Sequence, residues 1–113
     1  MKISPKSQRK EIKNGNFCIA YEYPLDEKAI NGCVIKLYGR YPEKGSALNE
    51  ISKEMGYVIK GSGKVTVNGA ETALAEGDVV LIEPGETYFW EGDMEIFMPC
   101  TPAWSPEQHK LIE

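Results

Sequence analysis

Residues that form tight turns interrupt this chain at short intervals and leave room only for short extended segments. Asn68-Gly69 separates two segments of alternating apolar and polar residues, and both residues of such a turn tolerate a positive φ. Further breaks fall at Gly61, Gly77-Asp78, Pro84-Gly85 and Gly92-Asp93. Most of the segments between these turns are shorter than an average helix, which has about 11–12 residues. The spacing of these turns therefore predicts an all-β structure for most of the chain.

The segments between the turns alternate with the two-residue period of strands that bury one face. In residues 32–41, for example, Cys33, Ile35 and Leu37 share the face that we expect to be buried. The β-branched run Val79–Ile82 is typical of a strand buried on both faces. The predicted strands are residues 17–23, 32–41, 57–59, 64–67, 71–74, 79–82, 87–91 and 94–100.

Only the C-terminal residues carry a helical signal. Ser105 is a suitable N-cap, Pro106 suits the first helical position, and Gln108 completes a capping box. We therefore expect a short helix over residues 106–112 that packs through Trp104 and Leu111.

Length and composition fit one globular domain. The chain has 113 residues, of which 42% are hydrophobic and 27% are charged. No apolar run approaches the roughly 20 residues that cross a bilayer, and the first residues lack the apolar stretch of a secretory signal. Three widely spaced cysteines, Cys18, Cys33 and Cys100, predict reduced, buried thiols. We expect a cytoplasmic protein without membrane association.

Charge is distributed unevenly and argues against nucleic acid as a partner. Residues 1–13 contain five Lys or Arg and one Glu, whereas nine Asp or Glu and no cationic side chain lie between Lys64 and Lys110. Binding of a phosphate backbone needs clustered cations. The chain contains one histidine, His109, in the predicted terminal helix, and Ser-His-Asp or Cys-His catalysis cannot be built from this lone terminal histidine.

Two spaced motifs resemble those of the cupin family. Glu54 is followed by six residues and Gly61, and Gly77-Asp78 is followed by an apolar run and Pro84-Gly85, with fifteen residues between Gly61 and Gly77. The resemblance covers about residues 32–100. It implies an all-β, cupin-type double-stranded β-helix, a jelly-roll barrel, to which we add the short C-terminal helix.

The resemblance also implies how the chain is organised. Residues 1–113 are predicted to form a single cupin domain with its core at about residues 32–100. An N-terminal strand arm covers residues 1–31, and the tail with its short helix covers residues 101–113. The resemblance further implies a homodimer, in which the strand around residues 17–23 pairs with a second copy.

The histidines that hold a divalent metal in the family are missing here. Counting back from the motif glutamate places the expected His-x-His pair at Leu48 and Glu50, or, with one extra residue, at Ala47 and Asn49. The third histidine position is Tyr88. Transition metals need about three or four well-placed donors, most often including imidazole.

We therefore expect no cofactor. The alternative that stays open is a divalent metal held by oxygen ligands, with Glu50 and Glu54 as the metal ligands and Asn49 beside them.

The motif frame predicts an aromatic and acidic barrel mouth. Glu54 and Tyr88 should point inward from facing strands, and Trp90 shares the face of Tyr88 because side chains repeat every second residue. A hydrogen bond from the Tyr88 hydroxyl to Glu54 would satisfy both groups. Packing alone is the alternative role for Tyr88 and Trp90. The candidate ligand-binding residues are Glu54, Tyr88, Trp90, Glu50, Asn49 and Tyr41.

Three functional hypotheses follow. The first is a metal-independent cupin that binds a small polar metabolite, for example a sugar, in the barrel mouth. The second is an enzyme resembling the sugar isomerases and epimerases of the family, in which Glu54 and Tyr88, the candidate catalytic residues, transfer a proton next to a carbonyl. The third is a barrel kept for subunit contacts.

Overall fold

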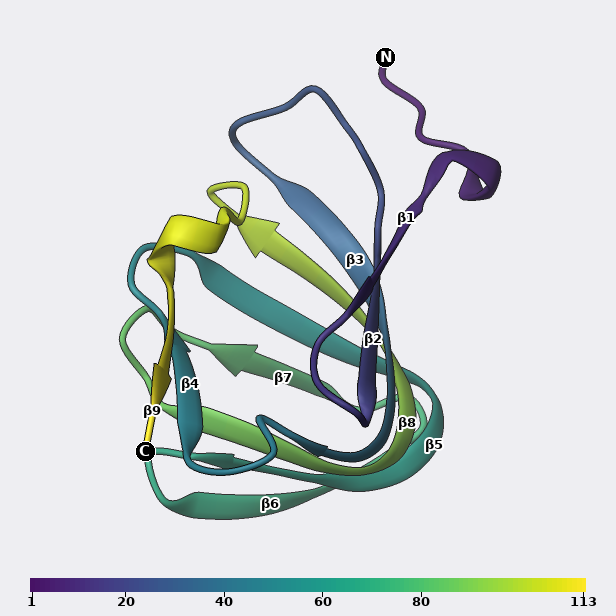
Figure 1. The fold of residues 1–113 in the computed structure, drawn as a ribbon. Helices are drawn as coiled ribbons and strands as arrows, with labels where there is room; N and C mark the ends of the chain where they lie inside the picture. Colours follow the sequence, from purple (N-terminus) through teal and green to yellow (C-terminus); the bar gives the residue numbers. More distant parts are fainter.

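Nine strands form one antiparallel sheet that curls upon itself (Figure 1). The structure is a computed structural model and describes all 113 residues. The all-β prediction is confirmed. The elements are η1 Lys6–Gln8, β1 Lys10–Lys13, β2 Cys18–Glu22, β3 Asn31–Tyr41, β4 Ser46–Asn49, β5 Lys53–Val67, β6 Ala70–Ala75, β7 Val79–Ile82, β8 Tyr88–Thr101, η2 Pro106–Gln108 and β9 His109–Ile112, where η denotes a 3-10 turn.

The order of the strands places the longest ones at the centre. Neighbouring strands follow the order β1-β2-β3-β8-β4-β9, and β5 pairs with β6, β7 and β8. Strands β5 and β8 run side by side for most of their length, from the pair Lys53 and Thr101 to the pair Val67 and Tyr88. Figure 1 shows both strands curving together around one end of the barrel.

Glycines allow these two strands to bend without interruption, which corrects the predicted strand boundaries. The sequence predicted turns near Gly61 and Gly92, but both residues lie inside continuous strands. Gly63 and Gly92 face each other in the β5–β8 register. A Cβ on Gly63 would lie 2.3 Å from the Glu91 carbonyl oxygen, and one on Gly92 would lie 2.5 Å from the Gly63 Cα. These glycines therefore permit a close backbone approach at a bend rather than a turn.

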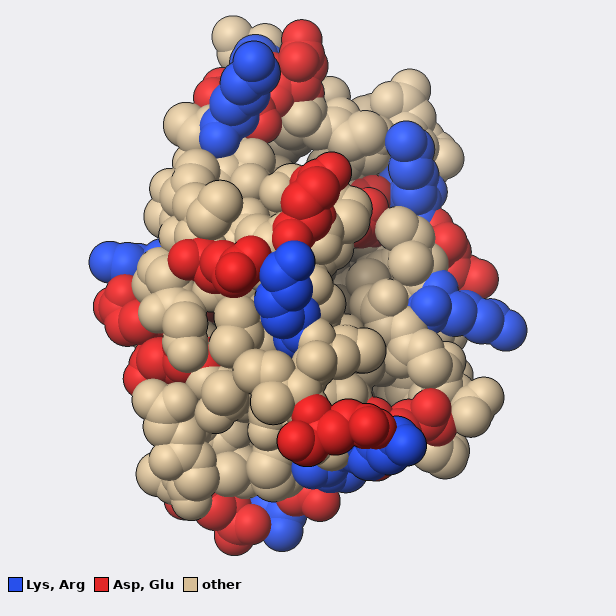
Figure 2. All heavy atoms as spheres, turned by 60° about the vertical axis from the view of Figure 1, so that its left-hand side comes forward, with Lys and Arg blue, Asp and Glu red and all other residues tan.

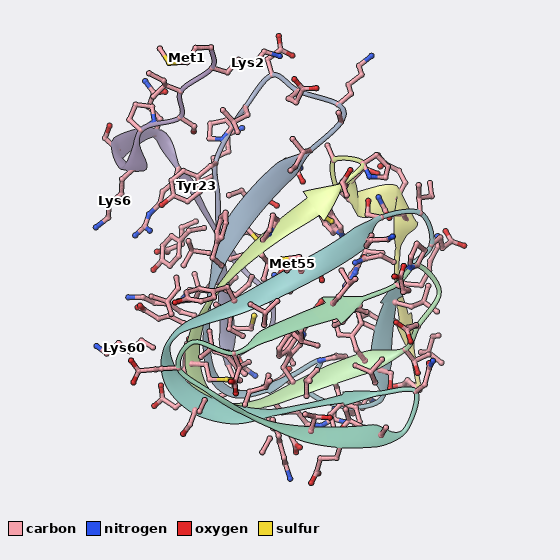
Figure 3. The ribbon with its side chains drawn as sticks, turned by 180° about the vertical axis from the view of Figure 1, so that it is seen from behind. Met1, Lys2, Lys6, Tyr23, Met55 and Lys60 are labelled. Atoms are coloured by element: carbon pink, nitrogen blue, oxygen red, sulfur yellow. The ribbon has the colours of Figure 1, made fainter.

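Alternation along β5 separates the barrel interior from its outer face. Glu54 and Val58 are buried, whereas Met55 and Tyr57 are exposed on the opposite side, where Figure 3 labels Met55. The core inside the barrel is formed by Cys18, Leu37, Ala47, Val58, Val65, Leu74, Ile82, Tyr88, Trp90, Met94, Ile96 and Met98.

Strand β7 does not have the two buried faces that its β-branched sequence predicted. Val79 is 56% exposed and Leu81 is 46% exposed, whereas Ile82 is buried. The reason is topological, because β7 pairs only with β5 and no second layer covers the outer side of the sheet.

The C-terminal segment is a strand and not the predicted helix over residues 106–112. One 3-10 turn is followed by β9, which pairs with β4. Ser105 forms no side-chain cap, and the Gln108 side-chain oxygen instead accepts hydrogen bonds from the backbone N–H groups of Ile51 and Ser52. Leu111 is 65% exposed, so it does not pack as predicted.

The sequence also missed β1, β4 and β9. Strand β1 is exposed at all four residues and pairs only with β2. Because β2 lies between β1 and β3 within one chain, both of its edges are already paired. The suggested pairing of the strand around residues 17–23 with a second copy is therefore not available in this structure.

The surface carries both signs of charge. On the face shown in Figure 2, cationic and anionic side chains are interspersed. Lys64, for example, pairs with Glu71 at 3.0 Å and with Glu91 at 3.5 Å. None of the helical turns is long and apolar enough to cross a membrane.

The close approach of β5 and β8 generates a stability prediction. Replacing Gly63 with alanine should lower the free energy of unfolding by about 1–3 kcal/mol, because the new Cβ forces the two backbones apart. Urea unfolding measures this difference. The control is Ser62→Ala at an exposed neighbouring position, which should change stability by less than about 0.5 kcal/mol. Equal stabilities of the two variants would contradict the proposed contact.

Candidate functional site

A pocket of about 500 Å³ opens into the barrel. Its walls come from β1, β2, β3, β5 and β8 together with residues of the C-terminal segment, and 15 of its 24 lining residues are hydrophobic. Small-molecule sites commonly have this size and combine an apolar lining with a few convergent polar groups. The polar groups therefore decide what the pocket can do.

Glu54 places a carboxyl group in this apolar environment. The residue is only 9% exposed and lies on the inward face of β5. Its side-chain oxygen contacts the Cys100 thiol at 3.9 Å, and no cationic side chain pairs with it. Burial raises the pKa of Glu54 from about 4.5 to about 7, and the Cys100 thiol only partly offsets this effect. The carboxyl group therefore exchanges a proton near neutral pH.

Tyr88 and Trp90 face the same interior from β8. Both are buried, and their rings meet edge to face with centroids 6.4 Å apart. Burial and the nearby Glu54 charge raise the pKa of Tyr88 well above its usual value of 10. The predicted hydrogen bond from Tyr88 to Glu54 is absent, because the hydrogen-bonding side chain at Glu54 is Cys100. Tyr88 stays a neutral phenol at physiological pH.

A hydrogen-bonded chain forms another part of the pocket wall. Asn49 and His109 lie opposite each other in the β4–β9 pair, and the Asn49 Oδ1 atom lies 2.9 Å from His109 Nδ1. Trp104 Nε1 donates to the same Oδ1 at 2.9 Å. His109 Nε2 lies 2.8 Å from the Tyr41 hydroxyl oxygen, and the two rings stack. The order of the chain is thus Trp104, Asn49, His109 and Tyr41.

Burial favours the uncharged forms of the two titratable residues in this hydrogen-bonded series, His109 and Tyr41. It lowers the pKa of His109, and it raises the pKa of Tyr41 to about 12. The backbone of Trp104 is held in place by the Asn31 side chain, which donates to the Trp104 carbonyl and accepts from its N–H. The four hydrogen-bonded residues are therefore uncharged, and Asn31 holds the first of them, Trp104, in place.

The structure brings together four of the six candidate ligand-binding residues. Tyr41, Glu54, Tyr88 and Trp90 all line the pocket. Asn49 is buried behind the wall, and its side-chain oxygen is already used by Trp104 and His109.

Glu50, the sixth candidate, does not line the pocket and takes the alternative role of a solvent-exposed carboxylate. Glu50 is exposed just beyond β4, and its carboxylate lies 3.7 Å from the Lys110 ammonium. The physical reason is alternation, because β4 turns Ala47 and Asn49 inward and leaves the next residue outside.

The available donors do not fit a metal site of the kind that the family resemblance implies. No group of three or more His, Cys, Asp or Glu side chains is arranged to hold a metal ion. Glu50 is exposed outside the barrel whereas Glu54 is buried inside it, so these two residues do not form the alternative metal site with oxygen ligands. Burial raises the pKa of Cys18 to about 12 and that of Cys100 to about 11, which keeps these free thiols protonated.

Sequence reasoning missed His109, Trp104 and the pocket cysteines Cys33 and Cys100. His109 was assigned to a helix outside both motifs, and only as part of β9 does it reach Asn49. Residues 109–112 are His-Lys-Leu-Ile and do not alternate, so no local signal for this strand competed with the capping pattern before it.

Comparisons with known proteins agree on the fold. Residues 42–97 match the sequence model of the family described as "Cupin domain". The Streptomyces nucleoside dehydratase Pac13 superimposes with a TM-score of 0.90 at 14% identity, covering 98% of this chain and 90% of that one.

A Pac13 variant solved with uridine gives a TM-score of 0.88 at 15% identity and covers 98% of this chain and 90% of its own. KdgF from Halomonas sp. gives 0.74 at 14% identity, covering 93% of this chain and 96% of that one. A search of curated proteins finds no significant match. The family match and the structural matches together show that the chain contains a cupin domain and has the cupin fold.

Proposed function

We propose that this cupin binds a small polar metabolite in its pocket without a metal ion, through Glu54, Tyr88, Trp90 and Tyr41. The observation that carries the proposal is the Glu54 carboxyl group, which is buried in an apolar cavity without a cationic partner. An inward carboxyl group in such surroundings is costly unless something binds to it. A ligand that hydrogen-bonds to Glu54 removes that cost.

The other lining groups support a ligand with both apolar and polar parts. The rings of Tyr88 and Trp90 offer flat surfaces, and aromatic faces beside a carboxylate suit sugar rings and related molecules. The structural neighbour Pac13 is a nucleoside dehydratase, and variants of it were solved with uridine. Sugars and nucleosides are therefore the first compounds to test.

A second candidate function is proton transfer on the bound molecule. Glu54 has a pKa of about 7, which is suitable for a general base at neutral pH. It would accept a proton from a carbon atom next to a carbonyl group. Tyr88, whose pKa is raised, would stabilise the developing oxyanion by donating a hydrogen bond rather than by releasing its proton.

We also propose a homodimer, formed through the outer face of β5, β7 and β8. In the strand register, Met55 lies opposite Leu81, and Tyr57 lies opposite both Val79 and Phe97. All five side chains are exposed and apolar. A two-fold contact would cover the same patch on both copies, and apolar patches of this kind mark interaction sites.

Ligand binding is tested by thermal shift with uridine, D-ribose and D-glucose. A compound at one hundred times its Kd should stabilise the protein by about 2.7 kcal/mol and raise the Tm. Glu54→Gln and Tyr88→Phe should each weaken binding about 10-fold or more, because each removes a hydrogen bond to the ligand. Exposed Glu76→Gln is the matched control and should bind normally. Unchanged binding by both pocket variants would exclude this pocket as the site.

Burial of Glu54 predicts a specific pH dependence of stability. Its pKa is higher in the folded state, so the native protein binds an extra proton between about pH 4.5 and pH 7. The free energy of unfolding should therefore fall as pH rises through this window, by about 3 kcal/mol in total.

Glu54→Gln should remove this fall, and Glu76→Gln should keep it, as measured by urea unfolding from pH 4.5 to pH 8. His109, whose pKa is lowered, has the opposite effect, but it is present in both proteins and cancels in their difference. Parallel stability curves for wild type and Glu54→Gln would mean that the carboxyl group is not buried as described.

The homodimer is tested by light scattering after size exclusion. Wild type should have twice the mass of the chain, whereas Leu81→Glu should shift the protein towards the monomer because it places a charge on the outer face. Thr72→Glu adds the same charge at an exposed position on β6 and should stay dimeric. A monomeric wild type would refute the proposal.

A further inference from the structure

The orientation of the Asn49 amide follows from its neighbour. An amide oxygen and nitrogen have similar shapes, so hydrogen-bond partners must decide between them. The indole N–H of Trp104 can only donate. Because Trp104 Nε1 lies 2.9 Å from the Asn49 side chain, the Asn49 atom at this contact must be its oxygen, Oδ1.

This oxygen fixes the tautomer of His109. His109 Nδ1 lies 2.9 Å from the same Oδ1, and two acceptors would repel each other at this distance. His109 Nδ1 therefore carries the hydrogen. In a neutral imidazole only one nitrogen is protonated, so His109 Nε2 presents a lone pair. Burial lowers the pKa of His109 and so supports the neutral form.

The tautomer in turn fixes the direction of the Tyr41 hydroxyl. Tyr41 Oη lies 2.8 Å from His109 Nε2 and must donate its only hydrogen to that nitrogen. The hydroxyl lone pairs of Tyr41 are then left for whatever occupies the pocket. Tyr41 consequently acts as a hydrogen-bond acceptor towards a ligand.

We propose that the pocket selects an uncharged molecule with free hydroxyl groups, which donate hydrogen bonds to Tyr41 and Glu54, and that it rejects phosphorylated or carboxylated forms of the same molecule. This inference rests on the proposed function, because it concerns the same pocket. It goes further because it names the ligand groups that the pocket recognises, which are hydroxyl groups, and those that it excludes, which are phosphate and carboxylate groups.

The charge of the pocket supports the exclusion of anions. No arginine lines it, and its one lysine, Lys10, is an exposed β1 residue that lies opposite Glu22 in the β1–β2 register. An anion deeper in the pocket would meet the Glu54 carboxylate in surroundings of low dielectric constant, where repulsion is strong. It would also leave the Tyr41 lone pairs without a donor. Besides Tyr41, two other phenols line the pocket, Tyr23 and Tyr88, and these can donate to a ligand oxygen.

The hydrogen-bond directions can be measured without any ligand. His109 is the only histidine in the chain, so ¹⁵N-histidine labelling gives signals from a single side chain. Long-range ¹H–¹⁵N spectra at pH 7 should show a protonated Nδ1 and an unprotonated Nε2. The opposite tautomer, or a doubly protonated ring, would overturn the inference. Trp104→Phe removes the donor that orients Asn49 and should yield a mixture of both tautomers, whereas an unchanged spectrum would contradict the role of Trp104.

Ligand selection is tested by calorimetry with two matched series. The first series is uridine, 2′,3′-dideoxyuridine and uridine 5′-monophosphate, and the second is D-ribose, 2-deoxy-D-ribose and D-ribose 5-phosphate. In at least one series the uncharged, fully hydroxylated compound should bind at least 10-fold more tightly than both analogues. Tyr41→Phe, which keeps the ring and removes the acceptor, should reduce its advantage over the deoxy compound.

The outcomes separate this inference from the proposed function. Equal or tighter binding of a phosphorylated or deoxy analogue overturns the inference and leaves the pocket established as a binding site. Failure of both series, together with failure of D-glucose in the thermal-shift test, counts against the proposed function and the inference alike. In that case an Nδ1–H tautomer would be a property of the ligand-free protein and would not support the inference about ligand selection.

Discussion

The pairing of β5 with β8 is the constraint on which the rest of the molecule depends. These strands stay paired around a sharp bend, with one register shift between Val58 and Lys60, and Gly63 and Gly92 let the two backbones approach. Because side chains alternate along each strand, the concave side collects Glu54 from one strand and Tyr88 and Trp90 from the other. The pocket is thus a direct product of the way in which the sheet bends.

The C-terminal segment completes the site by adding polar groups that β5 and β8 do not supply. Its Gln108 side chain binds the backbone that joins β4 to β5, and this contact places the next residue, His109, opposite Asn49. Such a buried polar cluster is stable only because its members satisfy one another. The same segment that closes the sheet therefore determines the direction of the Tyr41 hydroxyl group.

The sequence predicted the fold better than it predicted the site. Turn residues and two-residue alternation identified most strands, and the motif spacing correctly indicated a cupin barrel with Glu54 and Tyr88 inside. Glycines at close approaches have the same appearance in a sequence as glycines in turns, so Gly61 and Gly92 were taken for turn residues. The Tyr41–His109 contact joins residues far apart in the chain through a four-residue strand, and no local pattern reports such a contact.

One wall of the cavity is made by an edge of the sheet. Lys10 and Ile12 of β1 line the pocket, yet this strand is hydrogen-bonded only to β2 and is solvent-exposed along its whole length. Short edge strands open at a lower free energy than the central strands of a sheet. Fraying of β1 would therefore uncover this side of the cavity while the strands that carry Glu54 and Tyr88 stay paired, so solvent access to the cavity can change without any loss of the barrel.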